Sequence, residues 1–227
     1  SMERFFDILL SGCALIILSP LLVPIVTILK FSGEGEVFFF QERIGKDGKL
    51  FKLFKFATML KDSPNLGTGT VTMKDDPRVL PVGKFLRKTK INELPQLLNI
   101  FFGDMSVIGP RPLTAETFGS YSDATQSIIK QVRPGLSGIG SIIFRGEEDI
   151  MNGTTASVDF YHNVIAPYKG ALEEWFVANK GLYIYFMAII TTVWVIVFSN
   201  TKVTWIVFKG LPEPPAELKP SLNFREK

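Results

Sequence analysis

Two long apolar stretches lie near the ends of the chain, with a more polar region between them. The first runs from Ile8 to Leu29 without a charged residue, and the second runs from Gly181 to Phe198. Because a helix rises about 1.5 Å per residue, the first stretch is long enough to cross the roughly 30 Å hydrocarbon core of a bilayer. The second is barely long enough. This pattern predicts membrane contact at both ends of the chain.

A serine–proline pair, Ser19 and Pro20, lies near the middle of the first stretch. Proline lacks an N–H and its ring collides with the carbonyl one turn earlier, so we expect a kink there. Two structures fit this pattern. One is a kinked helix that spans the membrane once, and the other is a re-entrant helix-hairpin that dips into one leaflet and returns. A signal peptide is not expected, because the run is too long and no small-residue cleavage site follows it.

The second apolar stretch is rich in aromatic side chains, which prefer the boundary between head groups and hydrocarbon. These side chains are Tyr183, Tyr185, Phe186, Trp194, Phe198 and Trp205. We therefore expect helices that lie in or on the membrane boundary rather than a second span. Beyond them, the four prolines between Pro212 and Pro220 are expected to end ordered structure.

Between the apolar ends, alternating apolar and polar residues predict a β-hairpin. Its strands are expected at Val37–Gln41 and Leu50–Phe56, around a turn at Gly45–Gly48. Lys52 and Lys55 fall on opposite faces of the second strand, so at most one of them readily points at a site.

Helical spacing of apolar residues follows the hairpin. The expected helices cover residues 82–88, 94–102 and 114–131, and further helical stretches open at residues 158 and 181. A loop at residues 63–70 is rich in glycine and threonine, and the pattern favours a surface loop over a phosphate site there.

The composition supports membrane contact and gives only weak limits on other functions. Mean hydropathy is +0.23 and 46% of the residues are hydrophobic, which is high for a soluble protein. The net charge of +3 is too small to suggest nucleic acid, but a mildly basic surface suits anionic lipid and phosphate-rich substrates. Cys13 is the single cysteine, so there is no internal disulfide.

Candidate chemistry is concentrated between residues 89 and 112. Asn92 and Glu93 precede Pro95, near which we expect a helix to begin. Arg111 lies between two prolines, which gives a stiffly mounted guanidinium suited to binding phosphate or carboxylate. The alternative interpretation is a capped helix followed by a turn with a structural arginine–glutamate pair.

The string as a whole resembles the signature of the bacterial sugar transferase family, the monotopic phosphoglycosyl transferases. That signature reads Asp-Glu-Leu-Pro-Gln, then Gly-Asp-Met-Ser, then Gly-Pro-Arg-Pro, and it corresponds here to residues 92–96, 103–106 and 109–112. Further matches are residues 41–45, 51–56, 76–78, 83–88 and 133–138. The resemblance covers roughly residues 2 to 180.

The resemblance implies an α+β fold. We expect a mainly helical, membrane-associated domain with a small β-hairpin, an N-terminal re-entrant membrane helix and interfacial amphipathic helices. The expected division is a re-entrant helix-hairpin at 2–31, a cytoplasmic catalytic domain at 32–180, and C-terminal membrane-interface helices with a proline-rich tail at 181–227. Of the two structures open for the first apolar stretch, the resemblance favours the hairpin.

The resemblance also implies an enzyme. Members of this family move a sugar phosphate from a nucleotide-diphosphate sugar to polyprenol phosphate, at the start of bacterial glycan assembly of the capsule, exopolysaccharide or O-antigen type. The implied location is the cytoplasmic face of the bacterial inner membrane. The expected partners are a nucleotide sugar or other activated sugar donor, polyprenol phosphate and membrane lipid, without nucleic acid, and a homodimer is left open.

The site residues follow from the same motifs. Glu93 is the carboxylate that the signature places at the catalytic centre and at a Mg²⁺ ion. A divalent cation and arginines would stabilise the charge that develops on phosphoryl oxygens. The substrate-binding candidates are Arg111, Arg133, Arg145, Lys55 and Asp159.

Two positions depart from the family pattern. Asn92 stands where the family has its nucleophilic aspartate, and Ala57 stands where it usually has a basic residue. An amide cannot form an aspartyl-phosphate intermediate. Three explanations are open: Asn92 inactivates the chain, Glu93 does the catalytic work, or this branch catalyses a different glycan transfer or ligation step. A non-catalytic scaffold is a further alternative.

Overall fold

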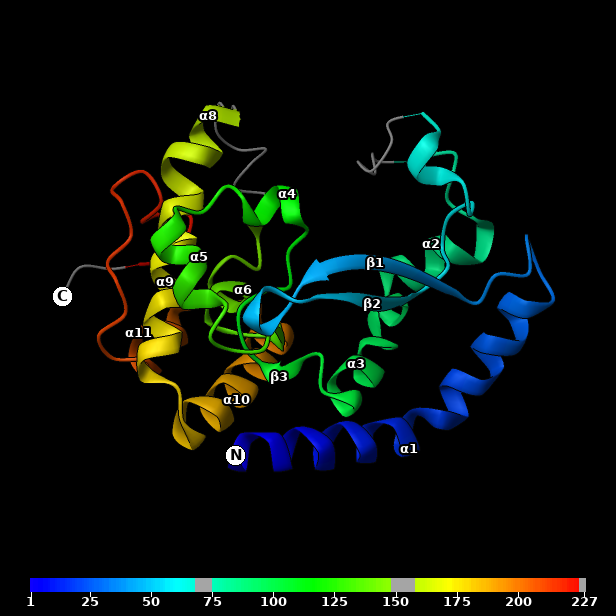
Figure 1. Cartoon of the computed structure of the whole chain (residues 1–227), viewed down its shortest axis with the longest axis horizontal. Coiled ribbons are helices and arrows are strands. Elements are labelled where there is room, and N and C mark those ends of the chain that lie inside the picture. Colours follow the sequence, from blue (N-terminus) through cyan, green and yellow to red (C-terminus); the bar gives the residue numbers. More distant parts are fainter. Residues whose placement is uncertain (68–74, 148–157, 225–227) are drawn as a thin grey trace. The chain divides into compact units, whose positions relative to one another are not determined.

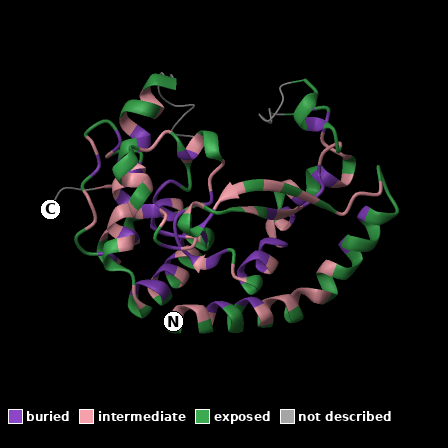
Figure 2. Cartoon of the chain, viewed as in Figure 1, coloured by how far each residue is buried: buried purple, intermediate pink, exposed green. Residues whose placement is uncertain are grey.

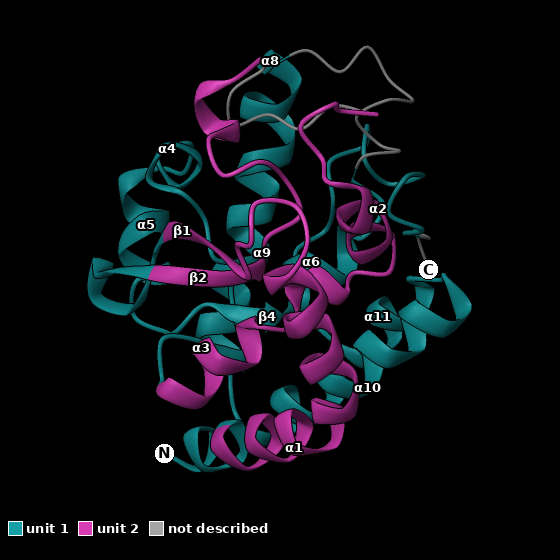
Figure 3. Cartoon of the chain, turned by 90° about the vertical axis from the view of Figure 1, so that its right-hand side faces the viewer, with its two compact units in different colours: residues 1–7, 43–51, 103–227 teal, residues 8–42, 52–102 magenta. Residues whose placement is uncertain are grey.

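A computed structural model describes residues 1–67, 75–147 and 158–224 (Figure 1). The chain divides into two compact units, coloured separately in Figure 3. The first unit contains residues 1–7, 43–51 and 103–227, and the second contains residues 8–42 and 52–102.

The elements alternate between short helices and short strands, with longer helices at the two ends. In chain order they are α1 (Met2–Lys30), β1 (Phe38–Ile44), η1 (Lys46–Gly48), β2 (Leu50–Phe56), η2 (Ser63–Asn65), α2 (Pro81–Lys88), η3 (Ile91–Glu93), α3 (Gln96–Phe102), β3 (Ser106–Ile108), α4 (Ala115–Phe118), α5 (Asp123–Ile129), β4 (Gly135–Ser137), α6 (Ile139–Ile143), α8 (Val158–Phe160), η4 (Tyr161–Ile165), α9 (Ala166–Asn179), α10 (Leu182–Phe198) and α11 (Lys202–Val207). This helix-dominated α+β composition agrees with the expected fold class.

α1 is one continuous helix that contains Pro20 and Pro24, and Figure 1 shows it bending near its middle. Pro20 has no N–H to donate to the carbonyl oxygen of Ile16. The hydroxyl of Ser19 donates to that oxygen instead, at 2.7 Å. The serine–proline pair therefore satisfies a carbonyl that would be costly to leave unpaired in hydrocarbon.

Within the described residues, α1 is the one helix long and apolar enough to cross a membrane. Its bend agrees with the expected kink at Pro20, whereas a re-entrant path through a membrane stays a prediction.

The expected hairpin is confirmed, and its residues 38–42 and 52–56 belong to the second unit. β1 and β2 pair antiparallel, joined by the short turn η1. Phe56 of β2 and Leu86 of α2 form a buried cluster with Ile25 and Leu29 of α1. The first part of the loop expected at residues 63–70 forms the turn η2, and residues 68–70 lie outside the described residues.

Asn99 fixes α3 against β2 within this unit. It is fully buried, its Oδ1 accepts the backbone N–H of Phe54 at 2.9 Å, and its Nδ2 donates to the carbonyl oxygen of Lys52 at 2.8 Å. A buried amide with both ends paired costs little and fixes the register of what it joins. The turn η3, which directly precedes α3, is therefore mounted on a well-anchored helix.

The first unit contains a two-stranded sheet that the sequence did not predict. β3 and β4 run parallel, with Ser106 opposite Gly135 and Ile108 opposite Ser137. The main core of the first unit lies among α6, α9, α10 and α11, where many buried apolar side chains cluster. Figure 2 shows the buried residues of these helices in purple.

The single helix expected at residues 114–131 is wrong. The structure has two shorter helices, α4 and α5, separated by a turn. The hydroxyl of Ser122 accepts the backbone N–H of Thr125 at 3.2 Å and caps the start of α5, as the hydroxyl of Thr114 does for α4. Local side-chain capping therefore starts a new helix where apolar spacing alone continues the first one.

α10 is buried along one side and exposed along the other. Its buried residues include Tyr185, Ala188 and Val195, while Val193 and Phe198 are exposed. A helix with an apolar exposed face suits the membrane boundary that the aromatic pattern predicts.

The proline-rich segment after α11 forms no helix or strand through Phe224. It nevertheless packs, because Leu218 and Leu222 are fully buried in the main core. The expectation that ordered structure ends at Pro212 is therefore wrong, and the physical reason is the burial of these two leucines.

Candidate active site

Asn92 and Glu93 lie in η3, directly before α3 begins at Gln96. The helix start predicted near Pro95 is therefore confirmed. Asn92 is 7% exposed, and its Oδ1 is buried without a hydrogen-bond partner among the described residues. Glu93 is half-buried. An unpaired buried acceptor costs free energy and is uncommon in a folded protein. The Oδ1 of Asn92 is therefore a candidate contact for a bound ligand or ion.

The two other residues of the second unit that bear on the site lie in and directly after β2. Lys55 is half-buried, whereas Lys52 is exposed, as expected for residues on opposite faces of the strand. Ala57 is buried and its N–H donates to the carbonyl oxygen of Val37 at 2.9 Å. The position that is basic in the family pattern is therefore a small apolar residue inside the unit.

In the first unit, the Gly-Pro-Arg-Pro and Arg-Pro-Gly motifs lie against each other. The N–H of Gly109 donates to Ser137 at 2.9 Å, and the N–H of Gly135 donates to Pro110 at 2.8 Å. A Cβ on Gly109 would lie 2.5 Å from the carbonyl oxygen of Arg133, so only glycine allows this approach. Close backbone contact therefore fixes the segments that carry Arg111 and Arg133.

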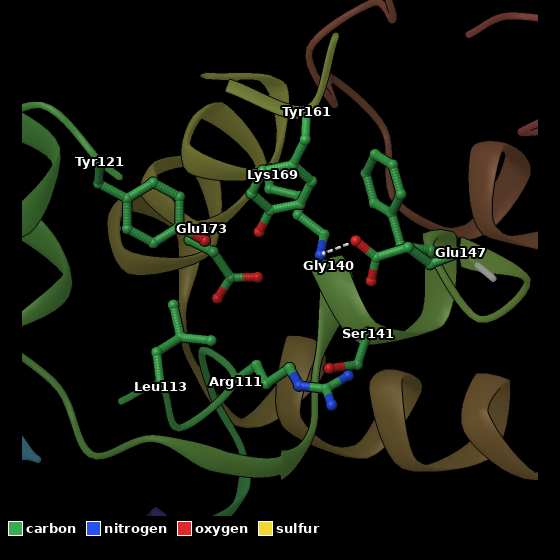
Figure 4. Close-up of a pocket in the computed structure, with 10 residues that line it drawn as sticks. Arg111, Leu113, Tyr121, Gly140, Ser141, Glu147, Tyr161, Lys169 and Glu173 are labelled. Atoms are coloured by element: carbon green, nitrogen blue, oxygen red, sulfur yellow. Dashed lines mark hydrogen bonds and ion pairs between the residues drawn. The ribbon is translucent and has the colours of Figure 1, made fainter. Parts of the chain in front are cut away.

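Arg111 lines a small pocket together with Glu173, Tyr121 and Tyr161 (Figure 4). Figure 4 shows Arg111 along one side of the pocket and Tyr161 on the other, with the carboxylate of Glu173 between them. On the same wall as Tyr161, Lys169 donates to Glu147 at 2.7 Å. The pocket therefore combines a guanidinium, a buried carboxyl group, an ion pair and two phenols.

Glu173 is the most perturbed acid of this pocket. It is 5% exposed, and burial raises the pKa of its carboxyl group to about 7. The N–H of Gly140 and the charge of Lys169 oppose that shift without cancelling it. A Cβ on Gly140 would collide with the carboxylate, so this glycine makes the room that Glu173 occupies. A carboxyl group that titrates near neutral pH in a pocket is a candidate for function.

Sequence reasoning missed Glu173, Lys169, Tyr121 and Tyr161. They come from α9, η4 and the turn before α5, and no spacing along the chain connects them with Arg111. The one available signal is Glu173 itself, an acidic residue at a position of α9 that faces the core.

The other predicted arginines of the first unit lie elsewhere. Arg133 lines a separate cavity, and its Nε donates to the carbonyl oxygen of Gly103 at 2.8 Å. Arg145 and Asp159 are exposed and line neither cavity. The structure therefore does not gather the four first-unit candidates, Arg111, Arg133, Arg145 and Asp159, into one pocket. The remaining candidates, Lys55, Asn92 and Glu93, belong to the second unit.

A divalent cation is compatible with the turn at Glu93 only if it takes most of its ligands from elsewhere. Over residues 1–67, 75–147 and 158–224, no group of three or more histidine, cysteine, aspartate or glutamate side chains lies together. Mg²⁺ characteristically needs only one or two protein carboxylates and completes its shell with phosphate oxygens and water. Glu93 and the unpartnered Oδ1 of Asn92 are oxygen ligands of the required kind.

Known proteins with related sequences support one family. Its sequence profile, described as "Bacterial sugar transferase", matches residues 1–199. The exopolysaccharide production protein ExoY of Sinorhizobium fredii is 37% identical over 174 residues, which cover 70% of this chain and 76% of that protein. The UDP-glucose:undecaprenyl-phosphate glucose-1-phosphate transferase of Escherichia coli is 38% identical over 162 residues, which cover 70% of this chain and 35% of that protein. The chain therefore belongs to the bacterial sugar transferase family.

Proposed function

We propose that this protein transfers a sugar phosphate from a nucleotide-diphosphate sugar to polyprenol phosphate, at the start of exopolysaccharide-type glycan assembly. The observation that carries the proposal is the family match over residues 1–199, which includes Glu93 and Arg111 within the signature motifs. The name of the related Escherichia coli protein specifies glucose, and that of a Salmonella typhimurium protein, 34% identical over 162 residues, specifies galactose. The sugar is therefore left unassigned.

The reaction needs no reagent beyond the nucleotide-diphosphate sugar and the polyprenol phosphate. An oxygen of the polyprenol phosphate forms a bond to the phosphorus that carries the sugar. The bond from that phosphorus to the bridging oxygen of the diphosphate breaks, and its electron pair leaves with the nucleoside monophosphate. The products are a polyprenol diphosphate sugar and a nucleoside monophosphate, which makes the released nucleotide the natural readout.

We assign the central catalytic role to Glu93. Because Asn92 cannot act as the nucleophile, Glu93 either attacks the phosphorus itself or acts as general base for direct attack by the acceptor. Mg²⁺, held by Glu93 and the Oδ1 of Asn92, would neutralise charge on the donor's phosphate oxygens. The buried, unpartnered Oδ1 supports a binding role for Asn92 in place of the missing nucleophile.

We assign the donor's charged end to the pocket lined by Arg111. A guanidinium held by rigid backbone suits bidentate contact with a phosphate. Glu173 and the two phenols offer hydrogen-bonding groups for hydroxyls of the donor. Lys55, Arg145 and Asp159 stay proposed substrate contacts that rest on the motif resemblance.

We further propose that α1 is re-entrant and that both of its ends face the cytoplasm at the bacterial inner membrane. The kinked, internally satisfied helix supports this proposal. In a Cys13→Ser background, Met2→Cys and Phe31→Cys place a thiol at two exposed positions at the ends of α1. A membrane-impermeant maleimide applied to inverted vesicles is expected to label both variants. Labelling of one from inside and the other from outside would establish a span instead.

The reaction is tested with purified full-length protein, polyprenol phosphate, Mg²⁺ and UDP-glucose or UDP-galactose labelled in the phosphate next to the sugar. The proposal predicts transfer of the label to the lipid fraction with equimolar release of UMP. Omission of the acceptor should abolish the lipid product. Release of labelled UDP, with no label in the lipid fraction, would favour transfer of the sugar alone, which is a different glycan transfer. The related Escherichia coli and Salmonella typhimurium transferases, assayed in parallel, are the positive controls. If they turn over and this protein turns over neither donor, the proposal is contradicted.

A further inference from the structure

α10 contacts both strands of the parallel sheet of the first unit, and Figure 1 shows it beside β3. The segment that carries Arg111 directly follows β3, and the segment that carries Arg133 leads into β4. α10 contains none of the signature motifs, and its apolar sequence predicts only membrane contact. Two of its hydroxyl groups nevertheless join it to the sheet, those of Tyr185 and Thr192.

The first link runs from Thr192 to β4. The hydroxyl of Thr192 donates to the carbonyl oxygen of Ala188 at 2.7 Å and lies 2.8 Å from the hydroxyl of Ser137. A hydroxyl group has one proton, so Thr192 accepts the second hydrogen bond and Ser137 donates it. Ser137 is the last residue of β4, and its carbonyl oxygen accepts the N–H of Gly109 at 2.9 Å. A single residue therefore joins α10 to the start of the Gly-Pro-Arg-Pro motif.

The second link runs from Tyr185 to β3 through Asp7. The hydroxyl of Tyr185 donates to Oδ1 of Asp7 at 2.8 Å, and the same oxygen accepts the N–H of Val107 at 3.0 Å and the hydroxyl of Ser106 at 3.0 Å. Asp7 and Tyr185 are both buried, so water competes little for these bonds. Tyr185 and Thr192 lie about two helical turns apart on one side of α10. Attachment at two turns fixes the rotation of the helix about its axis as well as its position.

Arg111 lies between two separately fixed points. Gly109 bonds to Ser137 on one side, and on the other the guanidinium of Arg43 donates to the carbonyl oxygen of Pro112 at 2.9 Å. Both neighbours of Arg111 are prolines, whose fixed φ leaves little freedom to absorb a displacement of Gly109. A shift of Ser137 therefore tilts the segment and changes the direction of the Arg111 side chain.

Close backbone packing prevents β4 from moving without this segment. A Cβ on Gly138 would collide with the carbonyl oxygen of Gly109, and a Cβ on Gly135 would collide with its nitrogen. Atoms packed this closely transmit a displacement instead of absorbing it. The position of α10 is therefore passed to Gly109 through β4.

We propose that Thr192 is a positioning residue for the reaction, which holds Arg111 in its direction through the hydroxyl and the carbonyl group of Ser137. Tyr185, through Asp7, keeps α10 in the orientation that this requires. Thr192 itself does not line the pocket of Arg111. The inference rests on the proposed function, because that proposal assigns Arg111 to a phosphate of the donor, and it adds a residue of the apolar C-terminal helix to the framework of the site.

The kinetic test is steady-state UMP release by full-length Thr192→Val, which removes the hydroxyl group and keeps the β-branched shape. We expect kcat/KM for the donor to fall about threefold to tenfold, chiefly through a higher KM, because one neutral hydrogen bond that directs a binding group is lost. Thr192→Ser keeps the hydroxyl group and should restore the wild-type value. An unchanged kcat/KM in folded Thr192→Val would overturn the proposal.

Thr191→Val is the matched control for this variant. It makes the same substitution at the adjacent position of the same helix, where the side chain points about 100° away around the axis. We expect its kcat/KM to equal that of the wild type. An equal loss in Thr191→Val and Thr192→Val would show that α10 merely tolerates no valine here, and would contradict a role for the Ser137 link.

A double-mutant cycle separates positioning of Arg111 from general loosening of the fold. Arg111→Ala leaves no guanidinium to direct, so Thr192→Val should cause no further loss of kcat/KM in that background. The same fold loss in both backgrounds would show that Thr192 acts on the whole protein, and the positioning role would be refuted.

The link itself is measured without substrate, by hydrogen exchange of the peptide that contains Gly109. The two prolines have no N–H, so Gly109 and Arg111 give the only amide signals of residues 109–112. We expect exchange at Gly109 to become about threefold to tenfold faster in Thr192→Val and in Ser137→Ala, and to stay at the wild-type rate in Thr191→Val. Ser137→Ala breaks the same bond from β4 and so decides the matter if Thr192→Val fails to fold. Unchanged exchange at Gly109 in Ser137→Ala would contradict the proposal.

The exchange measurement uses no donor, so it fails independently of the proposed reaction. Faster exchange in the variants of a protein whose wild type releases no UMP would support the link and contradict the reaction. UMP release by the wild type, with unchanged exchange and unchanged kcat/KM in the variants, would support the reaction and overturn the link.

Discussion

The turn that carries Asn92 and Glu93 and the pocket that carries Arg111 and Glu173 differ in how their polar groups are satisfied. In the turn, the Oδ1 of Asn92 is buried with no partner among the described residues. In the pocket, Glu147 and Lys169 pair at 2.7 Å, and the N–H of Gly140 supports the buried Glu173. The turn therefore contains a buried acceptor that no described residue satisfies, whereas Glu147, Lys169 and Glu173 of the pocket have partners within the protein.

This difference separates two kinds of functional residue. The turn lies inside a signature motif and is visible in the sequence, but its meaning depends on what binds there. The pocket is assembled by tertiary contacts and is preorganised, which is what recognition of a charged donor requires. Substitutions in the pocket should therefore affect stability and donor binding together.

Glu173→Gln is expected to have the largest effect on the free energy of unfolding, and this effect depends on pH. The pKa of the Glu173 carboxyl group is about 7 in the folded protein, above its ordinary value of 4.5, so between these two pH values the folded protein holds a proton that the unfolded chain releases. The stability from this group is fully present below pH 4.5 and is lost as the pH rises through 7, by up to about 3 kcal/mol.

Chemical denaturation in detergent between pH 4.5 and 8 measures this effect. Wild type should lose stability with rising pH relative to Glu173→Gln, and Glu174→Gln should follow the wild type. Parallel curves for wild type and Glu173→Gln would show that the carboxyl group ionises normally.

Arg111→Lys is expected to reduce kcat/KM by about 10- to 100-fold, because lysine keeps the charge and loses the planar, bidentate contact. Steady-state UMP release over a range of donor concentrations measures this. Lys49→Arg, an exposed change outside the pocket, is the control. If Arg111→Lys has the same kcat/KM as the wild type, Arg111 has no role in donor binding.

Gly140→Ala is expected to destabilise the protein by about 1–3 kcal/mol, because the added methyl group collides with the carboxylate of Glu173. Thermal unfolding in detergent measures the loss. Gly146→Ala is the matched control, since a Cβ there meets nothing within 4 Å. The double variant Gly140→Ala with Glu173→Ala should recover part of the loss. Equal melting temperatures of Gly140→Ala and Gly146→Ala would refute the collision.

Ser19→Ala is expected to have the smallest effect, about 1 kcal/mol, because it leaves the carbonyl oxygen of Ile16 without its hydrogen bond. Unfolding in mild detergent measures it, with Thr27→Ser as a control that keeps its own hydroxyl bond to Val23. No difference between the two would mean that water or detergent satisfies this carbonyl.

Much of the fold follows from local pattern. The hairpin, the start of α3 and the two apolar helices were predicted because each has a clear period or a proline at a defined place. β3 and β4 were not, since strands of three residues have no period and their pairing joins Ser106 to the distant Gly135. The break between α4 and α5 depends on the side-chain cap of Ser122, which competes with apolar spacing.

The site divides in the same way. Glu93 and Arg111 could be named from motifs, because their residue types and spacing match a family signature. Glu173 could not, because its burial depends on Gly140, a residue far away in the sequence that leaves room for the carboxylate. That the candidate arginines line different cavities is likewise a consequence of tertiary packing.

The most direct test of the central assignment is the initial rate of UMP release by Glu93→Gln beside wild type, with Glu116→Gln as an exposed control. Loss of the carboxylate should lower kcat on the order of 10³-fold, while Glu116→Gln keeps the wild-type rate. Activity that persists in folded Glu93→Gln, or that appears only when Asn92→Asp is introduced, would contradict the account.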